Sequence, residues 1–180
     1  MVDATDTESL ARRVYDAAHI TGTFTLRSGA VSNEYFDKYL FEADPALLAD
    51  LATALVTHVP EGIDALAGLE LGGIPIATML SQRTGLPARF VRKHAKEYGT
   101  CRLAEGGEIS DQRLLIVEDV VTSGGAILDA ARELRSEGAV LGPVICVIDR
   151  ESGGRENLAE AGLTLTALFT MSQLKSAALT

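Results

Sequence analysis

The chain has 180 residues, of which 47% are hydrophobic and 23% charged, and its formal net charge at pH 7 is −9. This size and composition fit one globular domain with a sizeable core. The acidic balance argues against a nucleic-acid-binding protein, which needs a basic face to neutralise phosphates. No stretch has the roughly 20 apolar residues that span a bilayer, and the first residues are acidic and polar, unlike a signal peptide. We therefore expect a cytoplasmic protein with free thiols at Cys101 and Cys146.

The hydrophobic pattern alternates between strand-like and helical segments along most of the chain. Strands that alternate with helices predict an α/β fold, with a mostly parallel central sheet that helices cover on both faces. In chain order the pattern predicts a helix over 7–18, short strands over 24–29 and 35–41, a helix over 45–58, a strand over 65–68, a helix over 73–83, strands over 88–92 and 114–117, a helix over 126–137, a strand over 144–148, a helix over 154–161 and a closing strand over 165–169.

Residues 93–112 interrupt this pattern, because the segment is rich in charged residues and glycine and has few apolar ones. A loop of about this length inside a compact domain is uncommon and is often a functional lid. We expect a mobile loop over 93–112. An exposed β-hairpin with charged faces is the alternative, since most charge runs are merely solvated.

The clearest chemical signal lies in residues 114–126, with the sequence LLIVEDVVTSGGA. Four apolar residues predict a buried parallel strand, and the polar residues and glycines after it lead into a helix. In open α/β sheets, ligands bind beyond the carboxyl ends of the strands. The N–H groups at a helix start suit a phosphate, which Gly124 and Gly125 allow to approach closely. Thr122 and Ser123 add hydroxyl donors, so the segment predicts a phosphate cradle.

Two adjacent acids, Glu118 and Asp119, stand directly before this cradle, where repulsion from a phosphate makes them costly. Their carboxylates can accept hydrogen bonds from the two hydroxyls of a ribose and can favour positive charge that develops on the sugar. The alternative is a capped helix after a strand, with Asp119 or Thr122 near the cap. The segment has no GK[ST] ending, which argues against ATP hydrolysis by a Walker-type site.

This segment resembles the motif with which type I phosphoribosyltransferases bind phosphoribosyl pyrophosphate (PRPP). The resemblance implies that family's fold in a single domain over 1–180, with a small N-terminal hood to which residues 20–42 contribute. It assigns the ribose hydroxyls to Glu118 and Asp119, and the 5-phosphate to residues 122–126. The PRPP-binding residues that it implies in this motif are Glu118, Asp119, Val120, Val121, Thr122, Ser123, Gly124, Gly125 and Ala126.

Residues 24–37 narrow the resemblance to the orotate phosphoribosyltransferases, with a basic residue before Ser-Gly and an aromatic pair shortly after it. A flat base that bears a carboxylate needs a stacking surface and a cation. Ordinary packing is the alternative for the aromatic pair, and a surface or ion-paired arginine is the alternative for Arg150, which follows the strand over 144–148. The orotate-binding residues implied by the resemblance are Arg27, Ser28, Gly29, Tyr35, Phe36, Thr122 and Arg150.

Residues 92–99, with the sequence RKHAKEYG, resemble the mobile catalytic loop of the family. Cations that a closing loop brings to a leaving pyrophosphate stabilise its growing negative charge. The resemblance implies this role for Arg92, Lys93 and Lys96, with Lys96 also a general acid. Tyr98 is implied as a further PRPP contact, and Asp119 beside the ribose completes the catalytic set.

Residues 70–75 resemble the loop that wraps the pyrophosphate, with Gly72 and Gly73 in close backbone contact. Three positions depart from the family pattern. Tyr98 stands where most members have histidine, and Arg27 and Gly72 stand where many have lysine. These differences alter the charge or geometry of single contacts and leave the identifying motif intact.

The resemblance as a whole implies that N1 of orotate displaces pyrophosphate from PRPP, giving orotidine 5′-monophosphate in pyrimidine biosynthesis. Mg²⁺ is expected to be held mainly by PRPP and water, since the sequence suggests no all-protein metal site. We expect a homodimer in which the loop over 93–112 completes the neighbouring active site, and no nucleic-acid or membrane partner. Two alternatives stay open: a purine or other pyrimidine phosphoribosyltransferase, and a non-catalytic PRPP-sensing regulator.

Overall fold

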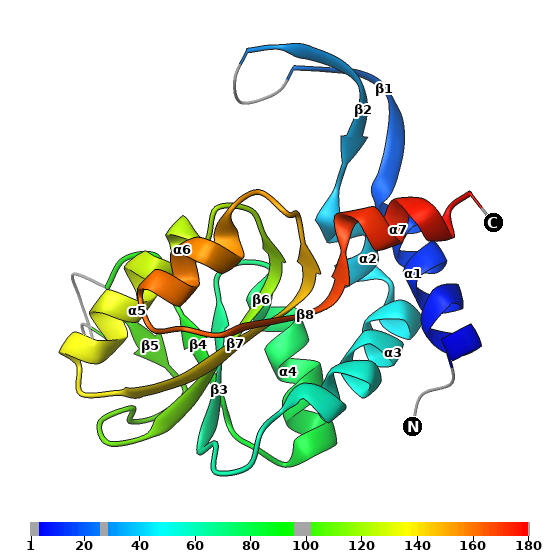
Figure 1. Ribbon diagram of the computed structural model, residues 1–180. Helices are drawn as coiled ribbons and strands as arrows, with labels where there is room; N and C mark the ends of the chain where they lie inside the picture. Colours follow the sequence, from blue (N-terminus) through cyan, green and yellow to red (C-terminus); the bar gives the residue numbers. More distant parts are fainter. Residues whose placement is uncertain (1–3, 26–28, 96–101, 180) are drawn as a thin grey trace.

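The computed structural model describes residues 4–25, 29–95 and 102–179. Its centre is a sheet with the strand order β5-β4-β3-β6-β7-β8 (Figure 1). All neighbouring strands pair in parallel except β4 and β5, which are antiparallel. The strands are β3 (Ala65–Leu69), β4 (Ala88–Val91), β5 (Ala104–Glu105), β6 (Arg113–Val121), β7 (Val140–Asp149) and β8 (Leu165–Thr170). The predicted α/β fold with a mostly parallel sheet is confirmed.

Helices cover both faces of this sheet (Figure 1). The helices are α1 (Ala4–Ala18), α2 (Lys38–Ala43), α3 (Pro45–Leu55), α4 (Gly73–Thr84), α5 (Gly125–Ser136), α6 (Gly154–Glu160) and α7 (Met171–Ala177), and a 3₁₀ turn, η1 (Val56–His58), follows α3. None of the helices in these described ranges has the length and apolar character needed to cross a bilayer.

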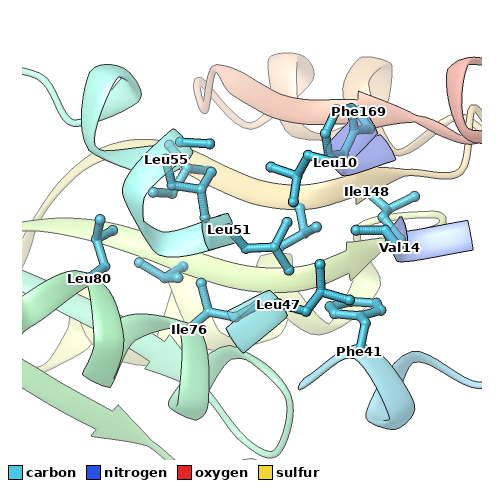
Figure 2. Packing of buried hydrophobic residues seen from close by; sticks show 14 of the residues in the cluster. Leu10, Val14, Phe41, Leu47, Leu51, Leu55, Ile76, Leu80, Ile148 and Phe169 are labelled. Atoms are coloured by element: carbon cyan, nitrogen blue, oxygen red, sulfur yellow. The ribbon is translucent and has the colours of Figure 1, made fainter. Parts of the chain in front are cut away.

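The alternation of side chains along β3 and β6 divides the core into two apolar clusters. Leu66 and Leu115 face a cluster that includes residues of α1, α3, α4 and α7, whereas Leu114 and Ile116 face a cluster with residues of α5 and α6. Figure 2 shows part of the first cluster, in which Phe41 is fully buried together with Leu47, Ile76 and Val14. Cys146 is buried in the second cluster and has a free thiol.

The N-terminal hood contains an antiparallel pair, β1 (His19–Thr25) and β2 (Val31–Phe36), which projects from the body of the domain (Figure 1). The strand predicted over 35–41 is wrong beyond Phe36. Asp37 caps a helix there, because its side chain accepts a hydrogen bond from Tyr39 N at 3.1 Å. The short helix that follows, α2, buries Phe41, and the polar cap rather than the alternating pattern decides the local structure.

The C-terminal part of the segment predicted as a loop over 93–112 packs against the edge of the sheet. Leu103 and Ile109 are buried, and β5 extends the sheet beside β4. Arg89 of β4 is buried and donates from its guanidinium to Glu108 O at 3.1 Å and to Gln112 Oε1 at 2.9 Å. Residues 96–101 lie outside the described residues.

Candidate active site

Several of the predicted site residues that the structure describes lie where the parallel strands β3, β4, β6 and β7 end, at one edge of the sheet. Glu118 and Asp119 lie near the carboxyl end of strand β6, while Arg150 directly follows β7 and Arg92 follows β4. Because the carboxyl ends of parallel strands lie side by side, residues far apart in the chain meet at this edge.

The predicted phosphate cradle has the backbone shape that an anion site needs. Gly124 adopts a left-handed conformation, with φ of 77°, and α5 begins at the next residue. Thr122 and Ser123 are exposed, and Asn157 Nδ2 donates to Ser123 O at 2.9 Å, which ties the turn to α6. Free N–H groups at the start of a twelve-residue helix, beside two exposed hydroxyls, suit a phosphate.

The two valines of the motif, Val120 and Val121, form backbone hydrogen bonds to other residues of the site. Val121 is buried, and its carbonyl accepts a hydrogen bond from Arg150 N at 2.8 Å. Val120 N donates to Asp119 Oδ1 at 2.5 Å. The backbone of the cradle is therefore tied directly to the arginine at the end of β7.

Glycine is required at both positions of the 72–73 pair because other groups occupy the space of a side chain. A Cβ on Gly73 would lie 2.3 Å from Val117 O, and a Cβ on Gly72 would lie 1.6 Å from Asp119 Oδ2. The carboxylate of Asp119 thus rests directly against the Gly72 backbone. This packing accounts for the glycine at a position where many members of the resembled family have lysine.

The acids of the site form a buried cluster with two residues that the sequence reasoning missed, Lys38 and Glu42 of α2. Lys38 Nζ lies 2.5 Å from Asp119 Oδ2, and Asp119 has no exposed side-chain surface. Glu42 is also buried, and its Oε1 lies 2.8 Å from the position of a Cβ on Gly72. The sequence signal for this pair is weak: two charged residues stand four positions apart in a partly apolar segment.

The acids of this cluster differ in the direction of their pKa shifts. Burial and then the nearby Asp119 raise the pKa of Glu118 well above its ordinary value, and the same two causes raise the pKa of Glu42 to about 9. Burial alone would raise the pKa of Asp119, but hydrogen bonds from Glu42, Lys38 and Glu118 lower it. Asp119 therefore loses its proton before Glu118 and Glu42 do, and Lys38 is its counter-ion. The raised pKa of Glu118 and the ion pair of Asp119 explain how two adjacent acids are tolerated beside the predicted phosphate cradle.

Three of the predicted orotate-binding residues meet in one pocket of about 260 Å³, lined by Tyr35, Phe36 and Arg150. The sequence reasoning missed two basic residues in its wall, His19 and Lys175, and the acidic Glu34, whose Oε2 lies 2.9 Å from His19 Nε2. The pocket joins the hood to the end of β7. It combines an aromatic surface with an exposed guanidinium, as a flat carboxylate-bearing base requires.

Tyr35 and Phe36 have different surroundings, since adjacent residues of a strand point to opposite faces. Phe36 packs against the first core cluster and lies 6.4 Å from Tyr15 between ring centroids. Tyr35 is 45% exposed and lies 5.6 Å from Phe24 between ring centroids. Phe36 thus has, in part, the ordinary packing role given above as the alternative for the aromatic pair. Tyr35 has the more exposed ring.

The predicted loop cations and the predicted pyrophosphate loop border a second cavity, of about 610 Å³. Arg92 and Lys93 line it together with Glu70 and with Ala126 at the start of α5. Lys93 N donates to the Glu70 carboxylate at 2.7 Å, which links the two loops. Of the other predicted site residues, Gly29 is described and exposed, whereas Arg27, Ser28, Lys96 and Tyr98 lie outside the described residues.

Comparison with known proteins agrees with this geometry. Residues 41–164 match the family model described as a phosphoribosyl transferase domain. The chain is 52% identical over 169 residues to an orotate phosphoribosyltransferase of a Nocardioides species, covering 94% of each chain. It is 42% identical over 176 residues to that of Halobacterium salinarum, covering 98% of this chain and 99% of the relative.

Solved structures show the same relationship. An orotate phosphoribosyltransferase of Mycobacterium tuberculosis H37Rv, in complex with Fe(III) dicitrate, superposes with a TM-score of 0.86 and 30% identity, covering 94% of this chain and 98% of that chain. A structure of the Mycobacterium tuberculosis enzyme in complex with PRPP superposes with a TM-score of 0.81 and 27% identity, covering 94% of this chain and 99% of that chain.

The fold, the phosphate cradle and the matched domain define a phosphoribosyltransferase of type I. Within that class, the full-length similarity to curated relatives is specific. The chain belongs to the orotate phosphoribosyltransferase family.

Proposed function

We propose that this protein is an orotate phosphoribosyltransferase, which joins the phosphoribosyl group of PRPP to N1 of orotate and releases pyrophosphate in pyrimidine biosynthesis. One observation carries the proposal beyond family membership. The pocket that contains Tyr35, Phe36 and Arg150 adjoins the phosphate cradle, because Arg150 N donates to the carbonyl of Val121. This backbone hydrogen bond fixes Arg150, in the wall of the proposed base pocket, relative to the segment that leads into the cradle.

The proposed roles follow from the chemistry of each group. The start of α5, with Thr122 and Ser123, binds the 5-phosphate, and Glu118 and Asp119 take the ribose hydroxyls. The ionised Asp119 also favours the positive charge that develops on the sugar as the bond to pyrophosphate breaks. Arg150 pairs with the carboxylate of orotate, and Tyr35 lies against its ring.

The leaving pyrophosphate gains negative charge, which cations at its position stabilise. Arg92 and Lys93, beside the glycine loop of residues 72–73, are proposed for this role together with Lys96, which also acts as a general acid on the leaving group. Changing Lys96 to alanine is expected to reduce kcat far more than it weakens PRPP binding. An unchanged kcat would remove Lys96 from the mechanism.

Mg²⁺ enters this proposal as part of the substrate, bound to PRPP. In the described part of the chain, no group of three histidine, cysteine or acidic side chains is arranged to hold a metal. Lys38 and Val120 N also engage both oxygens of Asp119. Mg²⁺ dehydrates reluctantly and favours phosphate oxygens and water, so it is proposed to stay mainly with the pyrophosphate.

A homodimer in which residues of one subunit's 93–112 segment complete the neighbouring site is part of the same proposal, as is a cytoplasmic location. Both rest on the family resemblance. Size-exclusion chromatography with light scattering tests the dimer. Mixing inactive variants of Lys96 and Asp119 tests the shared site, because a mixed dimer would recover one intact active site.

The decisive experiment follows the absorbance of orotate after the purified protein is mixed with PRPP and Mg²⁺. A PRPP-dependent loss of orotate with release of pyrophosphate supports the proposed reaction. Uracil and hypoxanthine, tested in the same way, distinguish another pyrimidine or a purine phosphoribosyltransferase. PRPP binding without turnover of any base would instead indicate a PRPP-sensing regulator.

A further inference from the structure

Lys38 forms an ion pair with Asp119 in the acidic cluster described above. Its Nζ lies 2.5 Å from Asp119 Oδ2, while Asp119 Oδ1 accepts from Val120 N at 2.5 Å. Both oxygens of the carboxylate are therefore engaged, and Asp119 has no exposed side-chain surface. Because no side-chain surface of Asp119 is exposed, a ribose hydroxyl reaches Oδ2 when the more exposed ammonium group of Lys38 moves aside.

Lys38 is the mobile partner in this pair because it is the exposed one. Its side chain is 32% exposed, and it rises from a helix whose Phe41 is fixed in the core (Figure 2). Asp119, in contrast, is held by the sheet on one side and by Glu42 and the Gly72 backbone on the other. A change in the contact therefore moves the lysine rather than the aspartate.

The ammonium group also lies beside the loop of residues 70–73, since the Asp119 oxygen that it contacts rests against Gly72. A side chain at position 72 would collide with Asp119, so this loop brings no cation of its own from that position. A lysine displaced from Asp119 remains at the mouth of the same site. There its charge can pair with a diphosphate, which is the most anionic part of PRPP.

We propose that Lys38 is a further PRPP-binding residue that acts by exchange: it neutralises Asp119 in the empty site and pairs with the diphosphate of PRPP when ribose hydroxyls replace it on Asp119. The inference rests on the proposed function, because it takes PRPP as the ligand. It assigns a role to α2, which contains none of the residues of the phosphate cradle or the base pocket.

The exchange makes opposite predictions for two ligands. Ribose 5-phosphate carries the ribose hydroxyls and the 5-phosphate but no diphosphate. It therefore displaces the Lys38 ammonium group from Asp119 without offering a diphosphate with which that group can pair. Replacing Lys38 with methionine should therefore weaken PRPP binding by about tenfold or more, as expected for a lost charge-assisted contact, while ribose 5-phosphate binds equally or more tightly. Lys38→Arg should recover part of the PRPP affinity, since it restores the charge.

Isothermal titration calorimetry with PRPP and with ribose 5-phosphate, in the presence of Mg²⁺, measures both affinities without requiring turnover. Arg12→Met is the matched control, because Arg12 forms an exposed pair with Asp16 on α1. If Lys38→Met does not fold, Lys38→Gln is measured in its place, with the melting temperature as the check on folding.

Unchanged PRPP affinity in the methionine variant would overturn the proposal. An equal loss of affinity for both ligands would also overturn it, since it would mean that Lys38 only holds Asp119 in place. Failure of the wild-type protein to bind PRPP would refute the proposed function itself, and is seen before any variant is compared. Binding of PRPP without conversion of orotate would refute only the proposed reaction.

Discussion

The carboxylate of Glu70 accepts a hydrogen bond from Lys93 N at 2.7 Å, although the two residues follow different strands. Glu70 directly follows β3 and begins the turn that contains Gly72, and Lys93 begins the segment predicted as a mobile loop. This bond fixes the base of that segment relative to the proposed pyrophosphate site.

Changing Glu70 to alanine should therefore lower kcat/KM for PRPP by about tenfold, since the two loops lose their common anchor. Glu70→Gln keeps an acceptor oxygen for Lys93 N and should lose less. Steady-state kinetics with varied PRPP measures the effect, with Glu137→Ala on the exposed end of α5 as the control. Equal losses in the glutamine and alanine variants would show that charge, rather than this hydrogen bond, matters.

Gly72→Ala should damage activity and stability together. The new Cβ would lie 1.6 Å from Asp119 Oδ2, so the carboxylate or the loop must move. We expect a loss of kcat/KM of about a hundredfold and destabilisation by roughly 1–3 kcal/mol. Urea unfolding and kinetics measure the two effects.

Gly22→Ala is the control for the Gly72 variant, because its new Cβ would meet only the ring of Phe24, at 3.1 Å. A Gly72→Ala protein with native kinetics would show that Asp119 has room to move without consequence. That result would contradict the tight packing between the aspartate and the glycine loop.

Arg150→Met should raise KM for orotate by about a hundredfold, because a charge-assisted pair with the base carboxylate is lost. The base provides its own control: uracil has no carboxylate, so any residual activity with uracil should change little. The preference for orotate over uracil, measured by competition, should fall accordingly. An unaltered preference would place the recognition of the carboxylate elsewhere, with Lys175 and His19 in the same pocket as the first candidates.

The pKa of Glu42 predicts a pH dependence of stability. Burial, followed by the contact with Asp119, raises the pKa of Glu42 from 4.5 to about 9 in the folded protein. Between these values the folded state holds a proton that the unfolded state has lost, so the free energy of unfolding falls as pH rises. Glu42→Gln cannot ionise, and should therefore gain stability relative to wild type by up to about 1.4 kcal/mol per pH unit.

Urea unfolding of both proteins at several pH values between 5 and 9 checks this prediction. Asp37, Lys38, Glu118 and Asp119, which face Glu42, are the same in both proteins, so the difference reports Glu42 itself. Parallel pH profiles for the two proteins would mean that Glu42 is already ionised in the folded state.

The sequence by itself determined the fold class and predicted a phosphate cradle. Short apolar runs separated by helical patterns require a covered parallel sheet, and the order of acids, hydroxyls and glycines after residue 117 specifies a phosphate site at a strand end. These features are local, since each depends on residues within one strand, its turn and the next helix. The same local reasoning failed over 38–41, where Asp37 caps α2 through its own side chain.

Only the tertiary structure decided which distant residues complete the site. Lys38 and Glu42 contact Asp119 although more than seventy positions of the chain separate them from it. Arg150 and Tyr35 line one pocket although several helices and strands lie between them in the sequence. Neither pairing leaves a periodic signal, because it depends on how α2 and the hood dock on the sheet. The physical reason is burial. The pKa values of the acidic cluster depend on how far the packed chain excludes water from it, and no short segment of sequence specifies that packing.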